Sequence, residues 1–158
     1  MRSLWTLAAL VLAAGCASYG GYGIEPGGGP EHVRAVMGEP AATFRNSDGT
    51  FDWAYPRGPA GYDTFMVHFT SAGTTASIEK VLDLPHFARV TPGLDQDAVL
   101  RIVGPPGRVE EFPRNRERVW DYRFMDSWGY SSNFSVVFNA EGRVNRAFTW
   151  REMHDERD

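Results

Sequence analysis

The side chains that could catalyse a reaction or bind a metal do not form a recognisable site in this sequence. None of the 4 histidines lies in an H-x₃-H or HExxH pattern that would suit zinc: His32, His68, His86 and His154. Adjacent carboxylates such as Glu110 and Glu111 would point to opposite faces of a strand, which does not suit shared acid–base chemistry. We therefore predict no catalytic residue, no metal site and no cofactor, and we expect a protein that is not an enzyme.

A loop rich in aromatic residues is the strongest candidate for a binding function. Trp128, Gly129 and Tyr130 lie between serines, in a segment that we expect to connect two strands. A tight loop cannot easily bury two large rings, and exposed rings beside arginines are common in protein-binding hot spots. We predict that Trp128 and Tyr130 bind another protein, together with the edges of the sheets. The possible polar companions of the two rings are Arg114, Arg116, Arg118 and, first of all, Arg123. The alternative is that these rings belong to the core.

The single cysteine, Cys16, is the other residue with distinctive chemistry. It follows a positive start and an almost wholly apolar run over residues 4–14, which predicts a secretory signal peptide over residues 1–15. The run is too short for a bilayer-crossing helix, which needs about 20 residues. Ala13-Ala14-Gly15-Cys16 resembles the lipobox of bacterial lipoproteins, although Ala13 replaces the commoner leucine. An ordinary signal peptide that leaves Cys16 as a free thiol is the alternative.

The lipobox resemblance implies a membrane anchor. Cys16 would carry acyl chains such as palmitate, and two or more chains hold a protein firmly on a membrane. Ala17, in place of aspartate, implies by Gram-negative sorting rules an outer-membrane lipoprotein that faces the periplasm. The glycine-rich segment that follows predicts a flexible tether over residues 16–29. A tether of this length spans about 20 Å on average.

The composition predicts a folded body and excludes one class of partner. Hydrophobic residues make up 42% of the chain and aromatic residues 13%, enough for a hydrophobic core. The formal net charge of −4 does not favour binding to nucleic acid. The charge itself identifies no partner, and the membrane is reached through the anchor; the family resemblance described below adds the expectation that envelope proteins are the partners.

The folded body reads as one pattern that occurs twice. Residues 33–40 match residues 99–106, with an offset of 66, and Trp53-Ala54-Tyr55 matches Trp120-Asp121-Tyr122, with an offset of 67. The offset grows only between these blocks, as expected if insertions fall in loops. We predict a first unit over residues 30–84 and a second over residues 85–158. Chance matching of ordinary helices and strands is the alternative.

Each unit is predicted to be a short helix followed by a three-stranded antiparallel meander. Pro30 and Asp95 are suited to begin the two helices, and Gly38 and Gly104 to end them. Alternating β-branched and aromatic residues predict the strands. In the first unit these are 51–55, 64–69 and 76–82, and in the second 119–124, 134–138 and 144–150. The predicted fold class is therefore α+β, with two tandem units after a signal peptide and a tether.

This arrangement resembles the SmpA/OmlA, or BamE-like, family of small outer-membrane lipoproteins. The resemblance rests on Thr91-Pro92-Gly93-Leu94, Gly104-Pro105-Pro106 and Trp120-Asp121-Tyr122, followed by Val137-Phe138 and Gly142-Arg143-Val144. It covers the second unit well and the first more loosely. It implies a non-enzymatic scaffold or modulator of envelope proteins, in outer-membrane protein assembly or envelope integrity. Tandem units are also similar to β-lactamase-inhibitory protein, so a periplasmic inhibitor or ligand-binding module is the alternative.

Overall fold

The computed structural model describes residues 23–24, 27–58 and 60–152. Within them the chain forms two four-stranded antiparallel sheets and three short helices, which agrees with the predicted α+β class. Cys16, the predicted signal peptide and most of the predicted tether lie outside the described residues. No helix in the described part of the chain is long and apolar enough to cross a membrane.

The first sheet follows helix α1 (Pro30–Met37) and has the order β1-β2-β3-β4. Its strands are β1 (Ala42–Arg45), β2 (Phe51–Pro56), β3 (Thr64–Phe69) and β4 (Thr75–Lys80). The glycines just before α1 already belong to this body, because the Gly27 amide donates to the Thr75 carbonyl and the Thr75 amide donates to the Gly28 carbonyl. Gly27 and Gly28, which the sequence assigned to the tether, therefore pair with the first sheet.

The second sheet follows helices α2 (Leu84–Phe87) and α3 (Gln96–Val103) and has the order β5-β6-β7-β8. Its strands are β5 (Arg108–Phe112), β6 (Glu117–Met125), β7 (Ser131–Phe138) and β8 (Val144–Arg151). Helix α2 spans the boundary predicted between residues 84 and 85. Its Phe87 packs on Phe134 of β7, so α2 contributes to the core of the second sheet.

The prediction of three-stranded meanders was wrong, because each sheet has a fourth strand. β1 is only four residues long, and β5 reads Arg-Val-Glu-Glu-Phe. Both are edge strands, and β5 leaves Val109 and Phe112 exposed. A short or charged edge strand lacks the alternation of a half-buried strand, so the sequence pattern gives little sign of it.

The predicted boundaries of the two longer helices are confirmed. Asp95 caps α3 by accepting from the Ala98 amide at 2.9 Å, and Pro30 occupies the first turn of α1. Both helices end at a glycine with a positive φ, 81° at Gly38 and 77° at Gly104. Each of these helices is eight residues long, so its stability depends on packing against a sheet.

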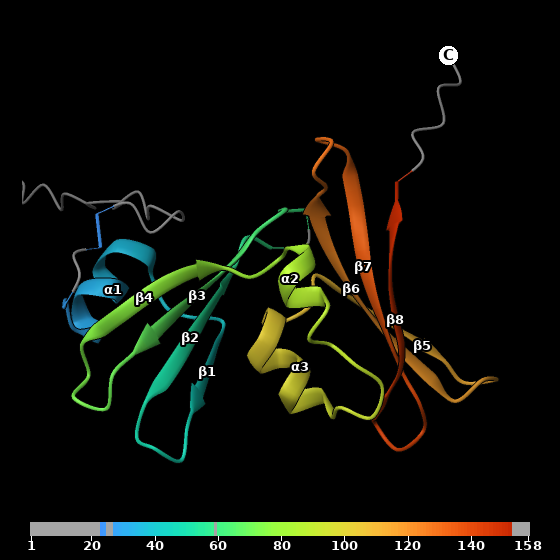
Figure 1. The fold of residues 1–158 in the computed structure, drawn as a ribbon, viewed down its shortest axis with the longest axis horizontal. Helices are drawn as coiled ribbons and strands as arrows, with labels where there is room; N and C mark the ends of the chain where they lie inside the picture. Colours follow the sequence, from blue (N-terminus) through green and yellow to red (C-terminus); the bar gives the residue numbers. More distant parts are fainter. Residues whose placement is uncertain (1–22, 25–26, 59, 153–158) are drawn as a thin grey trace, which may run out of the picture.

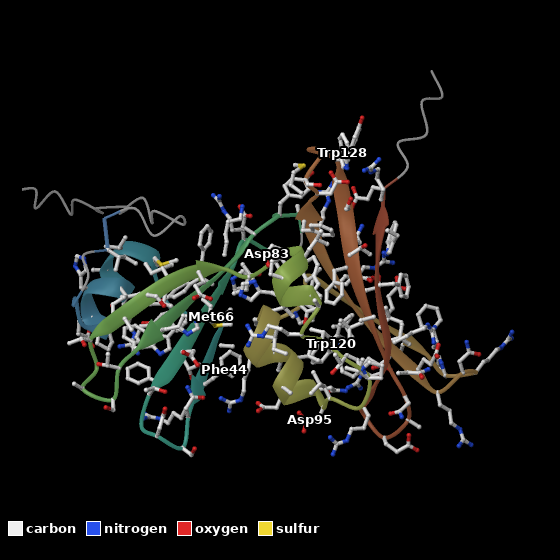
Figure 2. The ribbon with its side chains drawn as sticks, in the orientation of Figure 1. Phe44, Met66, Asp83, Asp95, Trp120 and Trp128 are labelled. Atoms are coloured by element: carbon white, nitrogen blue, oxygen red, sulfur yellow. The ribbon has the colours of Figure 1, made fainter. Side chains whose placement is uncertain are left out.

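The helices and sheets alternate in layers (Figure 1). Helix α1 covers one face of the first sheet, where Val33 and Met37 pack with Trp53 and Phe69. The other face of that sheet meets α3, since Leu100 packs against a cluster that contains Phe44 and the other buried residues Ala54, Met66 and Val81 (Figure 2). Helices α2 and α3 also cover the second sheet. Its opposite face has no helix on it within the described residues.

Candidate functional site

The predicted binding residues Trp128 and Tyr130 lie at the tip of the β6–β7 hairpin, at one end of the second sheet (Figure 2). Their side chains are 80% and 55% exposed. Asp126 holds the tip by accepting from the amides of both residues, each at 2.9 Å. Gly129, with φ of 78°, lies between them and takes a backbone conformation that favours glycine. The turn therefore presents two large rings to solvent on an ordered backbone.

A hollow of about 570 Å³ lies beside this tip, between the hairpin, α2 and β8. We call it the hairpin hollow. Its lining contains Asp83, Leu84, Pro85, Phe124, Met125, Asp126, Ser127, Trp128, Ser132, Thr149, Trp150 and Arg151. Large hydrophobic side chains are exposed around it, with Leu84 at 59% and Met125 and Trp150 at 45% and 46%. Exposed apolar residues that share one concave surface are typical of a binding site.

Arg151, which the sequence did not single out, is the arginine of this site. Its guanidinium lies 4.2 Å from the centre of the Tyr130 ring and 2.6 Å from Asp126 Oδ2. Burial, the largest influence on Asp126, raises the pKa of its carboxyl group. Donation by the Tyr130 amide, Arg151 and the Trp128 amide outweighs that effect and lowers the pKa overall. Asp126 therefore stays ionised and keeps Arg151 in place under Tyr130.

The predicted polar companions do not reach the hairpin hollow. Arg114 and Arg116 lie in the turn before β6, and Arg118 near its start pairs with Glu111 at 2.6 Å, whereas the hairpin follows the end of that strand. The prediction was wrong for these three residues because β6, nine residues long, carries them to the far end of the sheet. Nearness in the sequence did not mean nearness in space.

Arg123 occupies a neighbouring site on the face of the second sheet that no helix covers. It lines a separate hollow of about 400 Å³, and Trp150 lines both hollows. Its Nε donates to Glu152 Oε1 at 2.9 Å and its Nη2 donates to Glu152 Oε2 at 2.8 Å. The guanidinium also lies 4.5 Å from the centre of the Tyr62 ring. Arg123 is therefore held within the protein, and its predicted binding role stays a prediction.

Glu152 should make the stability of the protein depend on pH. Hydrogen bonds from Arg123 and Ser131 lower its pKa to about 2, from an ordinary value of 4.5, against the opposing effect of burial. A depressed folded-state pKa stabilises the protein above pH 4.5, and this stabilisation is lost as pH falls toward 2. We expect Glu152→Gln to lower the free energy of unfolding at pH 7 by about 2 kcal/mol, allowing for partial exposure.

The measurement is urea unfolding of both proteins between pH 7 and pH 3. The difference between wild type and Glu152→Gln should shrink as the solution becomes more acidic. Glu141→Gln, in the exposed β7–β8 turn, serves as the control and should show no comparable difference. A difference that stays constant over this range would contradict the assignment.

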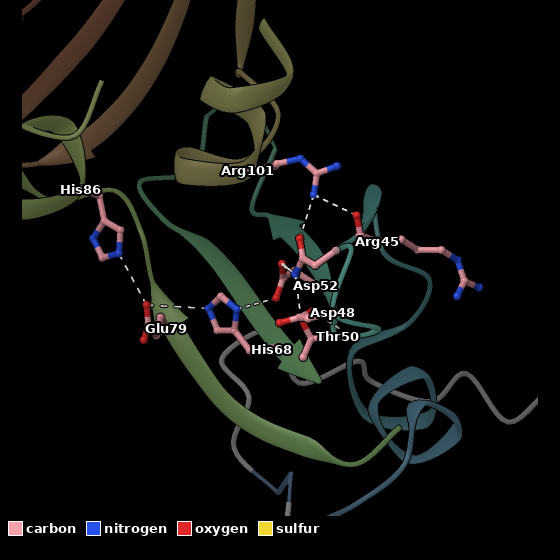
Figure 3. Close-up of polar contacts among 9 residues, drawn as sticks. Arg45, Asp48, Thr50, Asp52, His68, Glu79, His86 and Arg101 are labelled. Carbon is pink, nitrogen blue, oxygen red and sulfur yellow. Dashed lines mark hydrogen bonds and ion pairs between the residues drawn. The ribbon is translucent and has the colours of Figure 1, made fainter. Parts of the chain in front are cut away.

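Two histidines that are distant in the sequence face the same carboxylate (Figure 3). His68 Nε2 on β3 lies 3.7 Å from Glu79 Oε2, and His86 Nε2 on α2 lies 3.5 Å from it. The other ring nitrogen of each histidine lies 2.6 Å from an aspartate, Asp52 for His68 and Asp83 for His86. These polar contacts connect the first sheet to α2. Within the described part of the chain, no three His, Cys, Asp or Glu side chains are placed to hold a metal ion.

Comparisons with known proteins give limited resemblance. No family model matches the chain, and no curated protein matches it. A structure described as a putative osmotically inducible lipoprotein, OsmE, is 25% identical, with coverage of 42% of this chain and 70% of that chain and a TM-score of 0.38. The DUF4309 family protein YjgB from Bacillus subtilis subsp. subtilis str. 168 is 16% identical, with 78% of each chain covered and a TM-score of 0.31. The first is a likeness to part of a lipoprotein, and TM-scores this low establish no common fold.

Proposed function

We propose that this protein is a lipid-anchored envelope lipoprotein that acts by binding other envelope proteins at the hairpin hollow, without enzymatic activity. The observation that carries the proposal is the ordered hairpin tip, which exposes Trp128 and Tyr130 beside exposed Leu84, Met125 and Trp150. Aromatic anchors on a preorganised turn lose little conformational entropy when they bind. The BamE-like resemblance of the sequence adds the expectation of an outer-membrane scaffold or modulator.

The anchor part of this proposal depends on Cys16, the single cysteine of the chain. In bacteria that express the protein, radiolabelled palmitate should enter the full-length chain and should not enter a Cys16→Ala variant. The wild-type protein should fractionate with outer membranes and the variant should not. Equal labelling of both proteins would contradict lipidation at this residue.

The binding part is tested by capturing partners from envelope extracts with wild type and a Trp128→Ala/Tyr130→Ala variant. Loss of a hot-spot aromatic residue costs at least about 2 kcal/mol of binding energy, so capture should fall by more than tenfold. Phe112→Ala is the matched control, because Phe112 is an aromatic residue 42% exposed on β5, outside the lining of the hairpin hollow. An unchanged set of partners would exclude the hairpin as the binding site.

We also propose that the two halves are copies of one unit, each a helix followed by a four-stranded meander. The same hydrogen bond occurs in both, from Tyr55 Oη to the Gly38 carbonyl at 3.2 Å and from Tyr122 Oη to the Gly104 carbonyl at 3.1 Å. Burial raises the pKa of Tyr122, so its hydroxyl stays protonated and able to donate.

Matching ring contacts and edge contacts support the same proposal. Trp53 meets Phe69 edge-on at 4.9 Å, and Trp120 meets Phe138 edge-on at 4.6 Å. In each half, the segment before the helix pairs with the first residue of the last strand, Gly27 and Gly28 with Thr75, and Gly93 and Leu94 with Val144. Superposition of the two halves in an experimental structure would test the duplication.

The uncovered face of the second sheet favours the second candidate function, a periplasmic inhibitor or ligand-binding module. Polar groups converge there, since Trp150 Nε1 donates to Ser135 Oγ at 2.8 Å and Ser135 Oγ donates to Asp121 Oδ1 at 2.5 Å. Asn133 Nδ2 on the same face donates to Glu152 Oε1 at 2.9 Å. If the protein is such an inhibitor, its partner should be a secreted enzyme that loses activity when it binds this face. Its capture should be lost with Asn133→Leu and kept with Trp128→Ala.

A further inference from the structure

Strand β8 is the last strand of the second sheet, and no strand in the described part of the chain pairs with its outer edge. The Glu152 amide donates to the Ser131 carbonyl at 3.0 Å, which shows that the backbone groups of Glu152, and of every second residue before it, point toward β7. Because this direction alternates along an antiparallel pair, the amides and carbonyls of Ala147, Thr149 and Arg151 point away from β7. No described backbone group outside the sheet bonds to these three residues.

Among the described residues, only the beginning of this edge has a backbone partner outside the sheet. The Gly93 amide donates to the Val144 carbonyl and the Val144 amide donates to the Leu94 carbonyl, both at 2.8 Å. Beyond Val144 the strand is long and contains no proline, the usual features of an edge that accepts another strand. Its two arginines that could repel a neighbour are half exposed, and each is paired with a carboxylate of the same chain, Arg146 with Glu117 and Arg151 with Asp126. Because the exposed groups are backbone amides and carbonyls, the partner that binds this edge should be an extended strand.

We propose that β8 pairs with β8 of a second copy of this chain, antiparallel about a two-fold axis at Thr149, so that the two second sheets become continuous. The outward-pointing backbone groups of the two strands must face one another. The allowed registers therefore differ by a shift of one strand by two residues relative to the other, which moves the two-fold axis by one residue. The register centred on Thr149 places Phe148 opposite Trp150 of the second copy, and the two-fold axis repeats that pair. Both side chains are 46% exposed in the single chain.

The charges along the strand favour the same register. It places Arg146 opposite Glu152 of the second copy and Arg151 opposite Ala147, so no like charges face each other across the new strand pair. Moving the centre to Phe148 or to Trp150 sets Phe148 opposite Phe148 or Trp150 opposite Trp150, and in each case Arg146 and Glu152 no longer face each other. The inference rests on this edge and its side chains, and it does not depend on the proposed function.

Cysteine cross-linking tests the register directly, in full chains that carry Cys16→Ser so that the new thiols are the only ones. Opposed Cα atoms in a hydrogen-bonded pair lie about 5.5 Å apart, within the range of a disulfide. Thr149→Cys should therefore form a disulfide-linked dimer under mild oxidation. Ala147→Cys alone should not, because the two copies of Ala147 would lie about 13 Å apart, at four residues of strand rise. A mixture of Ala147→Cys with Arg151→Cys should cross-link.

Sedimentation velocity over a range of protein concentrations gives an independent measurement. Thr149→Pro removes a backbone amide that points outward, and it breaks no hydrogen bond to β7. This variant should therefore abolish the dimer, whereas Thr149→Ala should keep it. Equal cross-linking of Thr149→Cys and Ala147→Cys, or a sedimentation coefficient that stays monomeric at every concentration, would overturn the proposal. If Thr149→Pro fails to fold, the pattern of cross-links still decides.

Discussion

Replacing Gly104 by alanine is expected to destabilise the protein by about 4 kcal/mol, through two separate costs. The first is conformational, because Gly104 has φ of 77° and ψ of −170°, a region that only glycine occupies readily. The second is steric, since an added Cβ would lie 2.8 Å from Thr64 Cγ2 and 3.6 Å from Ala54 Cβ. Both neighbours belong to the first sheet, so the clash falls where α3 meets that sheet.

The chain provides a matched control for separating the two costs. Gly38 ends α1 with nearly the same conformation, φ of 81° and ψ of −164°, and an added Cβ there would meet nothing within 4 Å. Gly38→Ala should therefore show the conformational cost alone, about 2 kcal/mol. Adding Thr64→Ser to Gly104→Ala removes the clashing methyl group and should restore part of the loss. Equal effects of the two alanine variants in urea unfolding would contradict the close approach of α3 to the first sheet.

Phe87→Ala is expected to lower the free energy of unfolding by a similar amount, about 4 kcal/mol. The Phe87 ring is 5% exposed and stacks on Phe134, with centroids 4.1 Å apart. It also meets Phe124 edge-on at 4.9 Å. Truncation would leave a cavity between α2 and the second sheet, and a helix of four residues has few other contacts to hold it.

Leu84→Ala on the same helix separates stability from binding. Leu84 is 59% exposed and lines the hairpin hollow, so its truncation should change stability by no more than about 0.5 kcal/mol. The same variant should weaken capture of partners if the hairpin hollow is the binding site. Both variants should be measured by urea unfolding and in the capture experiment. If Leu84→Ala destabilised the protein as much as Phe87→Ala, the assignment of Leu84 to the binding surface would be wrong.

Elements with aromatic or β-branched alternation, or with glycine and proline at their ends, could be predicted from the sequence, and short or strongly charged elements could not. The glycine and proline punctuation placed both ends of α1 and α3, and the aromatic alternation located β2, β3, β6, β7 and β8. β1 and β5 were missed because β1 is only four residues long and three of the five residues of β5 are charged, so neither shows a hydrophobic alternation. Helix α2 escaped because its sequence, Leu-Pro-His-Phe, is too short to show a helical period.

The candidate site was only partly predictable, for a physical reason that differs from residue to residue. Trp128 and Tyr130 were predictable because two large rings at a hairpin tip have nowhere to be buried. Arg151 was not, because its contact with Tyr130 depends on the register of β8 against β7. The shared carboxylate of His68 and His86 depends in turn on how α2 approaches the first sheet. Long-range contacts of this kind leave no local pattern.

The face of the first sheet that meets α3 is covered by a residue that comes much later in the chain. Phe44, Ala54 and Met66 on that face are completed only when Leu100 arrives, more than thirty positions after Met66 in the chain. A chain in which α3 is not yet in place would expose this apolar surface. Since we propose that the chain is exported, we expect the amino-terminal half to depend on chaperones until residues 96–104 have also crossed the membrane.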